Sequence, residues 1–205
     1  MKSPSAIYPD DVLQKIAREL TILHALCTPG VADELDPSPS FELYCEVEHL
    51  VLYVIEKAIR GSERLHPSSQ SRLAHLLIEE WIASRKPFPK PSSGIVARTI
   101  VSLVIKTGLN TKLDRDGYGT FRTVYDSFLN SPYRKTGIKD LSDPDALAIF
   151  FLIRVRKGYT QEGQRIQWFD GTRTDTEIDV FRAHVSAHVA DSFARAVQTI
   201  QLLSY

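Results

Sequence analysis

The stretch 174–203 carries one long amphipathic pattern that no glycine or proline interrupts. Thr174 and Glu177 are spaced as in a capping box, in which each side chain satisfies a backbone N–H group of the first turn. At 100° per residue, one apolar stripe contains Ile178, Phe181, Val185, Val189, Ala196, Ile200 and Leu203. This pattern predicts a helix of about eight turns, which constrains the chain to an architecture that can cover so long a stripe.

The rest of the chain shows the same helical spacing in shorter segments. The first of these segments starts at residue 10, and Thr28, Pro29 and Gly30 are expected to end its helix. The apolar stretch 146–155 suits a central helix packed on all sides, with a buried strand as the alternative, and the polar stretch 110–120 is expected to be a loop. We therefore predict an all-α fold, a helical bundle of about seven helices. They are 10–27, 38–60, 68–84, 95–107, 120–129, 142–155 and 174–203.

Three prolines in the segment 85–94 predict a break between two parts of the chain. Pro87, Pro89 and Pro91 cannot continue a helix and favour a stiff, extended linker. We expect a small N-terminal three-helix unit in residues 1–84, the linker in 85–94 and a C-terminal four-helix bundle in 95–205.

Composition narrows the functional classes. The 25 basic and 25 acidic side chains cancel, which argues against a dedicated DNA-binding protein. Cys27 and Cys45 form no CxxC pair, so free thiols in a reducing compartment are expected. The sequence starts without a signal-peptide pattern, and its longest apolar run, 146–153, is too short to span a bilayer. We expect a cytoplasmic protein with no membrane association.

The candidate chemistry lies at the start of the last predicted helix. Arg182 is expected to point into the apolar stripe, His188 to lie on its border and His184 to lie nearer the polar side. A pair of histidines four residues apart also suits a metal. On the second predicted helix, however, His49 is expected to face solvent among glutamates, so no third ligand is apparent and we predict no metal or other cofactor.

The segment from Arg182 to His188, with four to six residues between an arginine and a later histidine, resembles the motif of HEPN-type helical domains. The resemblance covers about the C-terminal half. It implies a metal-independent endoribonuclease of a defence or toxin system, acting on RNA as a homodimer, with His188 as general acid or base and Arg182 as phosphate clamp. A second alignment places Arg154 and Tyr159 at the motif, which implies a relative that binds RNA without cutting it.

Basic and aromatic residues alternate ahead of the last predicted helix, a pattern that suits single-stranded RNA. The candidate RNA-binding residues are Arg154, Arg156, Lys157, Arg165, Trp168 and Arg173. The alternative is that the aromatic residues anchor a loop to the core and that the basic residues form a solvated face. Two other functions remain open: a non-catalytic module that binds a protein partner through an exposed apolar stripe on the N-terminal helices, and a metal-binding bundle.

Overall fold

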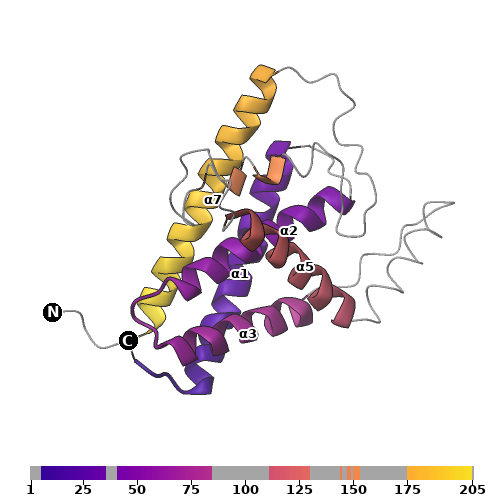
Figure 1. The fold of residues 1–205 in the computed structure, drawn as a ribbon. Helices are drawn as coiled ribbons and strands as arrows, with labels where there is room; N and C mark the ends of the chain where they lie inside the picture. The colour runs from indigo at the N-terminus through magenta and orange to yellow at the C-terminus, as the bar shows by residue number, and fades with distance from the viewer. Residues whose placement is uncertain are drawn as a thin grey trace.

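The computed structural model describes residues 6–35, 41–84, 111–129, 144, 147–148, 150–152 and 175–204, and it shows an all-α protein (Figure 1). Its helices are α1 (Asp10–Leu35), α2 (Phe41–Arg60), α3 (Pro67–Ser84), α5 (Thr111–Leu129) and α7 (Asp175–Leu203). Residues 144, 147–148 and 150–152 are also helical, as the helix prediction for 142–155 required. Among the described residues, the only β pairing is a single bridge between Ala6 and Leu65.

Helix α2 is the central element of the fold. It contacts α1, α3, α5 and α7, and the run from Leu50 to Ile55 is buried on every side. Its valines, leucines and isoleucines cover most of its circumference, as a helix surrounded by others requires. In the stretch 146–155, which the sequence also predicts to be packed on all sides, the described residues Leu147, Ala148, Phe151 and Leu152 are buried.

One hydrophobic core includes helices from both sides of the proline-rich segment. Helix α7 packs along α1 and α2 (Figure 1), and Val185, Val189, Ala196 and Ile200 are buried there. The proline-rich segment 85–94 and the predicted helix 95–107 lie outside the described residues. Residues 1–84 and 95–205 thus both contribute to the same core.

Helix α1 continues through the expected stop signal, so the predicted end at residue 27 is wrong. Pro29 and Gly30 lie inside α1, which runs on to Leu35. Val31 and Ala32 beyond them are 1% and 0% exposed. Burying these two residues against the rest of the bundle favours a further turn of helix, although a proline inside a helix removes a hydrogen bond.

The predicted loop over 110–120 is also wrong, because α5 begins at Thr111 and runs without a break through two glycines. Its first half carries Tyr118, which is 1% exposed, and its second half carries Phe121 and Tyr125, both 0% exposed. Since these rings share one face at helical spacing, their burial offsets the low helix propensity of Gly117 and Gly119.

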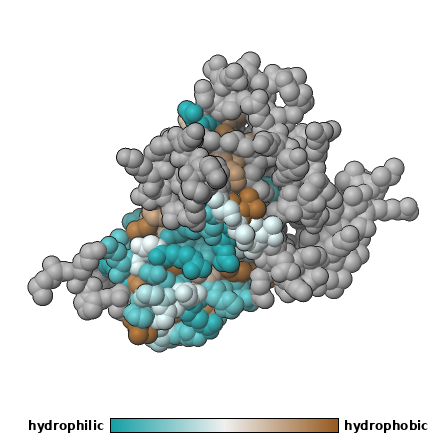
Figure 2. Space-filling view, in the orientation of Figure 1, coloured by the Kyte–Doolittle hydropathy of each residue, from teal (hydrophilic) through white to brown (hydrophobic). Residues whose placement is uncertain are grey.

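The predicted bounds of α3 and α7 are confirmed to within one residue. Leu73, Leu77 and Trp81 of α3 face the core. Figure 2 shows mainly hydrophilic side chains on the visible face of the described part of the molecule. No helix within the described ranges combines the length and the apolar character that crossing a bilayer requires.

The segment ahead of α1 ties together the α2–α3 turn and the end of α7. Ala6 N donates to Arg64 O and His66 N donates to Ala6 O, each at 3.0 Å. The Tyr8 hydroxyl donates to the carbonyl oxygen of Ser204 at 2.6 Å. Residues 6–8 and 204, at opposite ends of the sequence, therefore meet in space.

Candidate functional site

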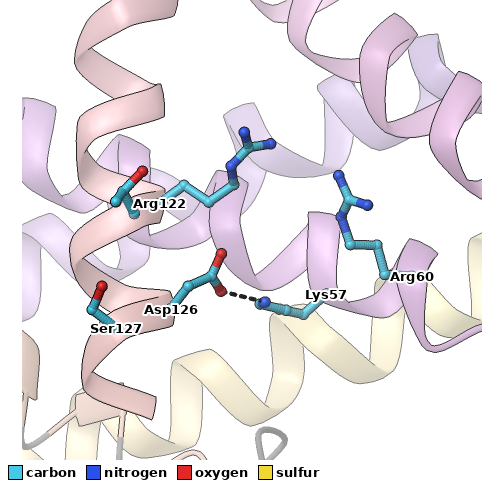
Figure 3. Close-up of a pocket in the computed structure, with 6 residues that line it drawn as sticks. Lys57, Arg60, Arg122, Asp126 and Ser127 are labelled. Atoms are coloured by element: carbon cyan, nitrogen blue, oxygen red, sulfur yellow. Dashed lines mark hydrogen bonds and ion pairs between the residues drawn. The ribbon is translucent and has the colours of Figure 1, made fainter. Parts of the chain in front are cut away.

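A pocket of about 570 Å³ lies between α2 and α5. Figure 3 shows Lys57 and Arg60 of α2 facing Arg122 and Asp126 of α5 across this pocket. Its lining residues are Lys57, Arg60, Arg122, Thr123, Asp126 and Ser127. Among the described residues, three cationic side chains therefore share this pocket with one carboxylate and two hydroxyl groups.

A buried carboxylate orients the two arginines. The Glu56 side chain is 2% exposed, and its Oε1 accepts hydrogen bonds from Arg60 Nε at 2.7 Å and Arg122 Nη1 at 3.2 Å. Its Oε2 accepts a hydrogen bond from the hydroxyl group of Tyr118. A buried charge is tolerated when it is paired and hydrogen-bonded in this way. Each guanidinium group is thus held on one side by Glu56. The Arg60 side chain remains 44% exposed and the Arg122 side chain 38% exposed.

A second carboxylate holds Lys57. Asp126 Oδ1 accepts hydrogen bonds from Lys57 Nζ at 2.6 Å and from the Tyr53 hydroxyl at 2.8 Å. Lys57 Nζ also lies 4.8 Å from the centroid of the Tyr53 ring, within the range of a cation–π contact. These contacts fix the ammonium group at the edge of the pocket.

The surroundings shift the titration of three groups in this network. Burial, followed by the charge of Glu56, raises the pKa of Tyr118 well above its usual range. Burial and the hydrogen bond to Asp126 raise the pKa of Tyr53. Burial by itself would raise the pKa of Asp126, but the hydrogen bonds from Lys57 and Tyr53 outweigh it and the pKa is lowered. Both tyrosines therefore remain neutral donors and Asp126 an acceptor at neutral pH.

The arrangement suits an anionic ligand. Lys57, Arg60 and Arg122 carry three positive charges, and the carboxylates of Glu56 and Asp126 carry two negative ones, so these five described side chains together keep one net positive charge. Guanidinium groups held by a buried carboxylate present their remaining N–H groups in a fixed orientation, and such groups bind phosphate and carboxylate oxygens well. The hydroxyl groups of Thr123 and Ser127, which also line the pocket, can donate further hydrogen bonds.

Helical spacing explains why the network forms at this place. On α2, Tyr53, Lys57 and Arg60 follow one another at intervals of four and three residues and so lie on one face. On α5, Arg122 and Asp126 are four residues apart. When these two faces meet, each cation has a carboxylate on its own or the opposite helix.

A smaller pocket of about 250 Å³ adjoins the first one and is mostly apolar. It is lined by Val54, Lys57, Pro144, Leu147, Val189, Ala190 and Phe193. Lys57 lines both pockets, so the two are neighbours along α2.

Neither of the predicted catalytic residues is among those that line the two pockets. Arg182 is exposed, so the core does not bury it although it shares a helix face with the apolar stripe; His184 is exposed, as predicted. His188 is half-buried, and it packs against α1 where a Cβ atom added to Gly30 would lie 3.3 Å from His188 Cε1. A side chain at position 30 would crowd this contact, which accounts for a glycine inside α1.

The spacing of Arg182 and His188 on α7 separates their side chains. Six residues of α-helix turn the two directions about 120° apart and separate them by about 9 Å along the axis. Both residues therefore lie on α7 as predicted, but on different sides of it. A shared site for them would need groups from another part of the protein or from a second copy.

All the candidate RNA-binding residues, Arg154, Arg156, Lys157, Arg165, Trp168 and Arg173, lie outside the described residues. The described residues include a basic pocket between α2 and α5, which the sequence analysis did not identify.

The described residues include no candidate metal site. Among them, no three or more histidine, cysteine or acidic side chains are grouped so that they could hold a metal ion. The expectation that His49 faces solvent is wrong. His49 is 6% exposed, and its ring centroid lies 5.6 Å from that of Trp81 and 5.5 Å from that of Phe121. It belongs to an aromatic cluster between α2, α3 and α5.

The sequence does contain a signal for the pocket. Glu46, His49, Tyr53, Glu56 and Arg60 recur at alternating intervals of three and four residues, which places them on one face of α2. A polar stripe on an otherwise apolar helix indicates either solvent or a polar partner. The partner, α5, could not be paired with it because residues 110–120 were expected to be a loop.

Comparisons of the chain with protein-family models, with curated proteins and with solved structures found no match.

Proposed function

We propose that this protein binds RNA and that the pocket between α2 and α5 holds a phosphate group of the strand. The observation that carries the proposal is the convergence of Lys57, Arg60 and Arg122 on one pocket. Phosphate contacts from lysine and arginine provide most of the affinity in nucleic-acid binding. The basic and aromatic residues at 154–173 and the resemblance to HEPN-type domains favour RNA as the anion.

The test is binding of a labelled single-stranded RNA of about ten nucleotides, measured by fluorescence anisotropy at several salt concentrations. Arg122→Gln removes one cation while Glu56 keeps Arg60 and Tyr118 as partners. We expect this variant to bind about tenfold more weakly, and the slope of log affinity against log salt to fall by about 0.7, the value for one phosphate contact on a single strand.

Arg72→Gln is the matched control for this experiment. Arg72 is 45% exposed, similar to Arg122, and is paired with Asp10 on the surface rather than with the pocket. We expect its affinity to equal that of the wild type. Wild-type affinity in Arg122→Gln, with both variants folded, would contradict the proposal.

Cleavage of RNA is a second candidate function, favoured by the resemblance at Arg182 and His188. Because neither residue is among those that line the pocket, binding and cutting can be separated. If the protein is a metal-independent ribonuclease, it cuts RNA in excess EDTA, and His188→Gln binds RNA normally without cutting it. A folded wild type that binds RNA and leaves it intact would restrict the function to binding.

A protein-interaction module is favoured by a different feature. Ile22 and Leu26, one turn apart on α1, are 54% and 69% exposed. They form a small apolar surface of the kind expected for a partner helix. The basic pocket takes precedence because it combines several charged groups in fixed positions, whereas single exposed apolar residues are common on any protein.

A further inference from the structure

The two neighbouring pockets differ in chemistry. The larger pocket is lined by charged and hydroxyl groups, and the smaller one is lined by aliphatic side chains and the ring of Phe193. Lys57 lines both pockets, and its ammonium group is paired with Asp126 at 2.6 Å. A ligand that combines an anionic group with a compact apolar group could therefore occupy both.

We propose that the smaller pocket binds a nucleobase, and that the pair of pockets takes one nucleotide of a single strand, with its phosphate beside Arg60 and Arg122 and its base beside Phe193. This inference rests on the proposed function, because it takes the anion in the larger pocket to be a nucleotide phosphate. It adds that the strand is bound with a base turned away from its neighbours. Such a pair of pockets selects single-stranded over duplex RNA.

Size and surface chemistry favour a base as the occupant. A volume of about 250 Å³ corresponds to about eight water molecules in liquid water, which suits a ring system and is too small for a long acyl chain. Phe193 offers an aromatic surface on which a base can stack, and the walls from Val54, Leu147 and Val189 are apolar. Unstacked bases in RNA complexes are commonly held by aromatic side chains in this manner.

The position of Lys57 fits the same ligand. Because Lys57 lines both pockets, a nucleotide with its phosphate in the larger pocket and its base in the smaller one would pass this residue. The ion pair with Asp126 limits the motion of the Lys57 side chain before a ligand binds. A preformed site loses less side-chain entropy when the ligand enters.

The test compares three small phosphates on the full chain by isothermal titration calorimetry: adenosine 5′-monophosphate, ribose 5-phosphate and octyl phosphate. Ala190→Trp is the main variant, because Ala190 is exposed and lines only the smaller pocket. Phe193→Ala is the second variant, which removes the aromatic surface without filling the space. Ala83→Trp, at an exposed helical alanine of α3 that lines neither pocket, is the matched control.

We expect the wild type and Ala83→Trp to bind adenosine 5′-monophosphate about tenfold more tightly than ribose 5-phosphate, in line with the affinity gained by stacking one base. Ala190→Trp and Phe193→Ala should lose this difference and keep the affinity for ribose 5-phosphate. Octyl phosphate should bind no better than ribose 5-phosphate.

Three results would overturn the inference. If the wild type bound the nucleotide and ribose 5-phosphate with equal affinity, the smaller pocket would not bind a base. The proposal of a phosphate site in the larger pocket would still stand. Octyl phosphate binding as tightly as the nucleotide would identify a general apolar site. No binding of any of the three phosphates would contradict the phosphate pocket itself, and the proposed function with it.

Discussion

At the scale of single residues, Glu56 is the group on which the basic pocket depends. Its carboxylate is buried and accepts hydrogen bonds from two arginines and a tyrosine. Without these donors, a buried carboxylate would cost several kcal/mol. The arginines in turn are held in place by Glu56, so the charge that the pocket offers to a ligand is positioned by a residue that lies behind it.

Tyr118→Phe should lower the stability of the protein more than Tyr53→Phe. Tyr118 is the donor to Glu56, which is 2% exposed, whereas Tyr53 donates to Asp126, whose side chain is 36% exposed and can accept water instead. We expect the free energy of unfolding to fall by about 1.5–3 kcal/mol for the first variant and by about 1 kcal/mol for the second. Urea denaturation of both variants measures the difference; equal losses would contradict it.

The raised pKa of Tyr118 makes stability depend on alkaline pH. The unfolded chain releases the tyrosine proton near pH 10, while burial keeps the folded protein protonated to higher pH. The contribution is therefore complete below about pH 10 and is lost as the pH rises beyond it. We expect unfolding free energy to fall with pH between about 9.5 and 11 more steeply in the wild type than in Tyr118→Phe, by up to about 1.4 kcal/mol per pH unit. Parallel profiles would refute this.

At the scale of helices, α1 shows how packing overrides a local signal. Thr28, Pro29 and Gly30 resemble a helix end, yet the helix continues and Val31 is buried. The Thr28 hydroxyl donates to the carbonyl oxygen of His24 at 2.9 Å, inside the helix. The contact between α7 and Gly30 joins residues that are distant in the sequence, so rules that use only neighbouring residues cannot predict it.

Pro29→Ala should stabilise the protein. Pro29 is exposed and lies inside α1, where proline removes a backbone hydrogen bond and crowds the preceding turn. Alanine restores the hydrogen bond and relieves the crowding, so we expect the free energy of unfolding to rise by about 1–3 kcal/mol. Thermal and urea unfolding check the result, with Ala25→Gly, at an exposed position of the same helix, as a control that should lose about 1 kcal/mol. A decrease on Pro29→Ala would mean that the backbone geometry that proline imposes at this position is needed for packing.

How much of the fold the sequence predicts depends on how each helix is stabilised. Helices α3 and α7 have clear apolar stripes and start signals, so their bounds follow from the sequence. Helix α5 begins in a polar stretch with two glycines and forms because three rings pack against α2 and α3. The pocket could not be predicted for the same reason. It needs Arg122 and Asp126 opposite α2, and their placement follows from the packing of α5.

At the scale of the whole molecule, the described helices share one core. Helix α7 fills the surface formed by α1 and α2, and its contacts with them join the two ends of the sequence. Apolar burial is the main term that favours folding. A large part of the surface that α1 and α2 bury therefore depends on a helix that follows the proline-rich segment.

A fragment of residues 1–84 should not fold cooperatively by itself. Without α7, the faces of α1 and α2 that contact Val185, Val189, Ala196 and Ile200 would be open to water. We expect a helical but loosely packed state with a broad thermal transition and strong binding of a hydrophobic dye. Co-expression with residues 95–205 should restore a sharp transition. A sharp transition in the fragment alone would show that the N-terminal helices form an independent unit.

The contact between Tyr8 and Ser204 gives the chain the form of a closed ring, with residues almost 200 positions apart joined by one hydrogen bond. A donor dye attached before residue 6 and an acceptor dye attached after residue 204 would lie close together only while the ring is closed. In an unfolded chain of this length the same dyes would lie several times farther apart. Energy transfer between the two ends thus provides a single-molecule signal for folding that requires no change in the core.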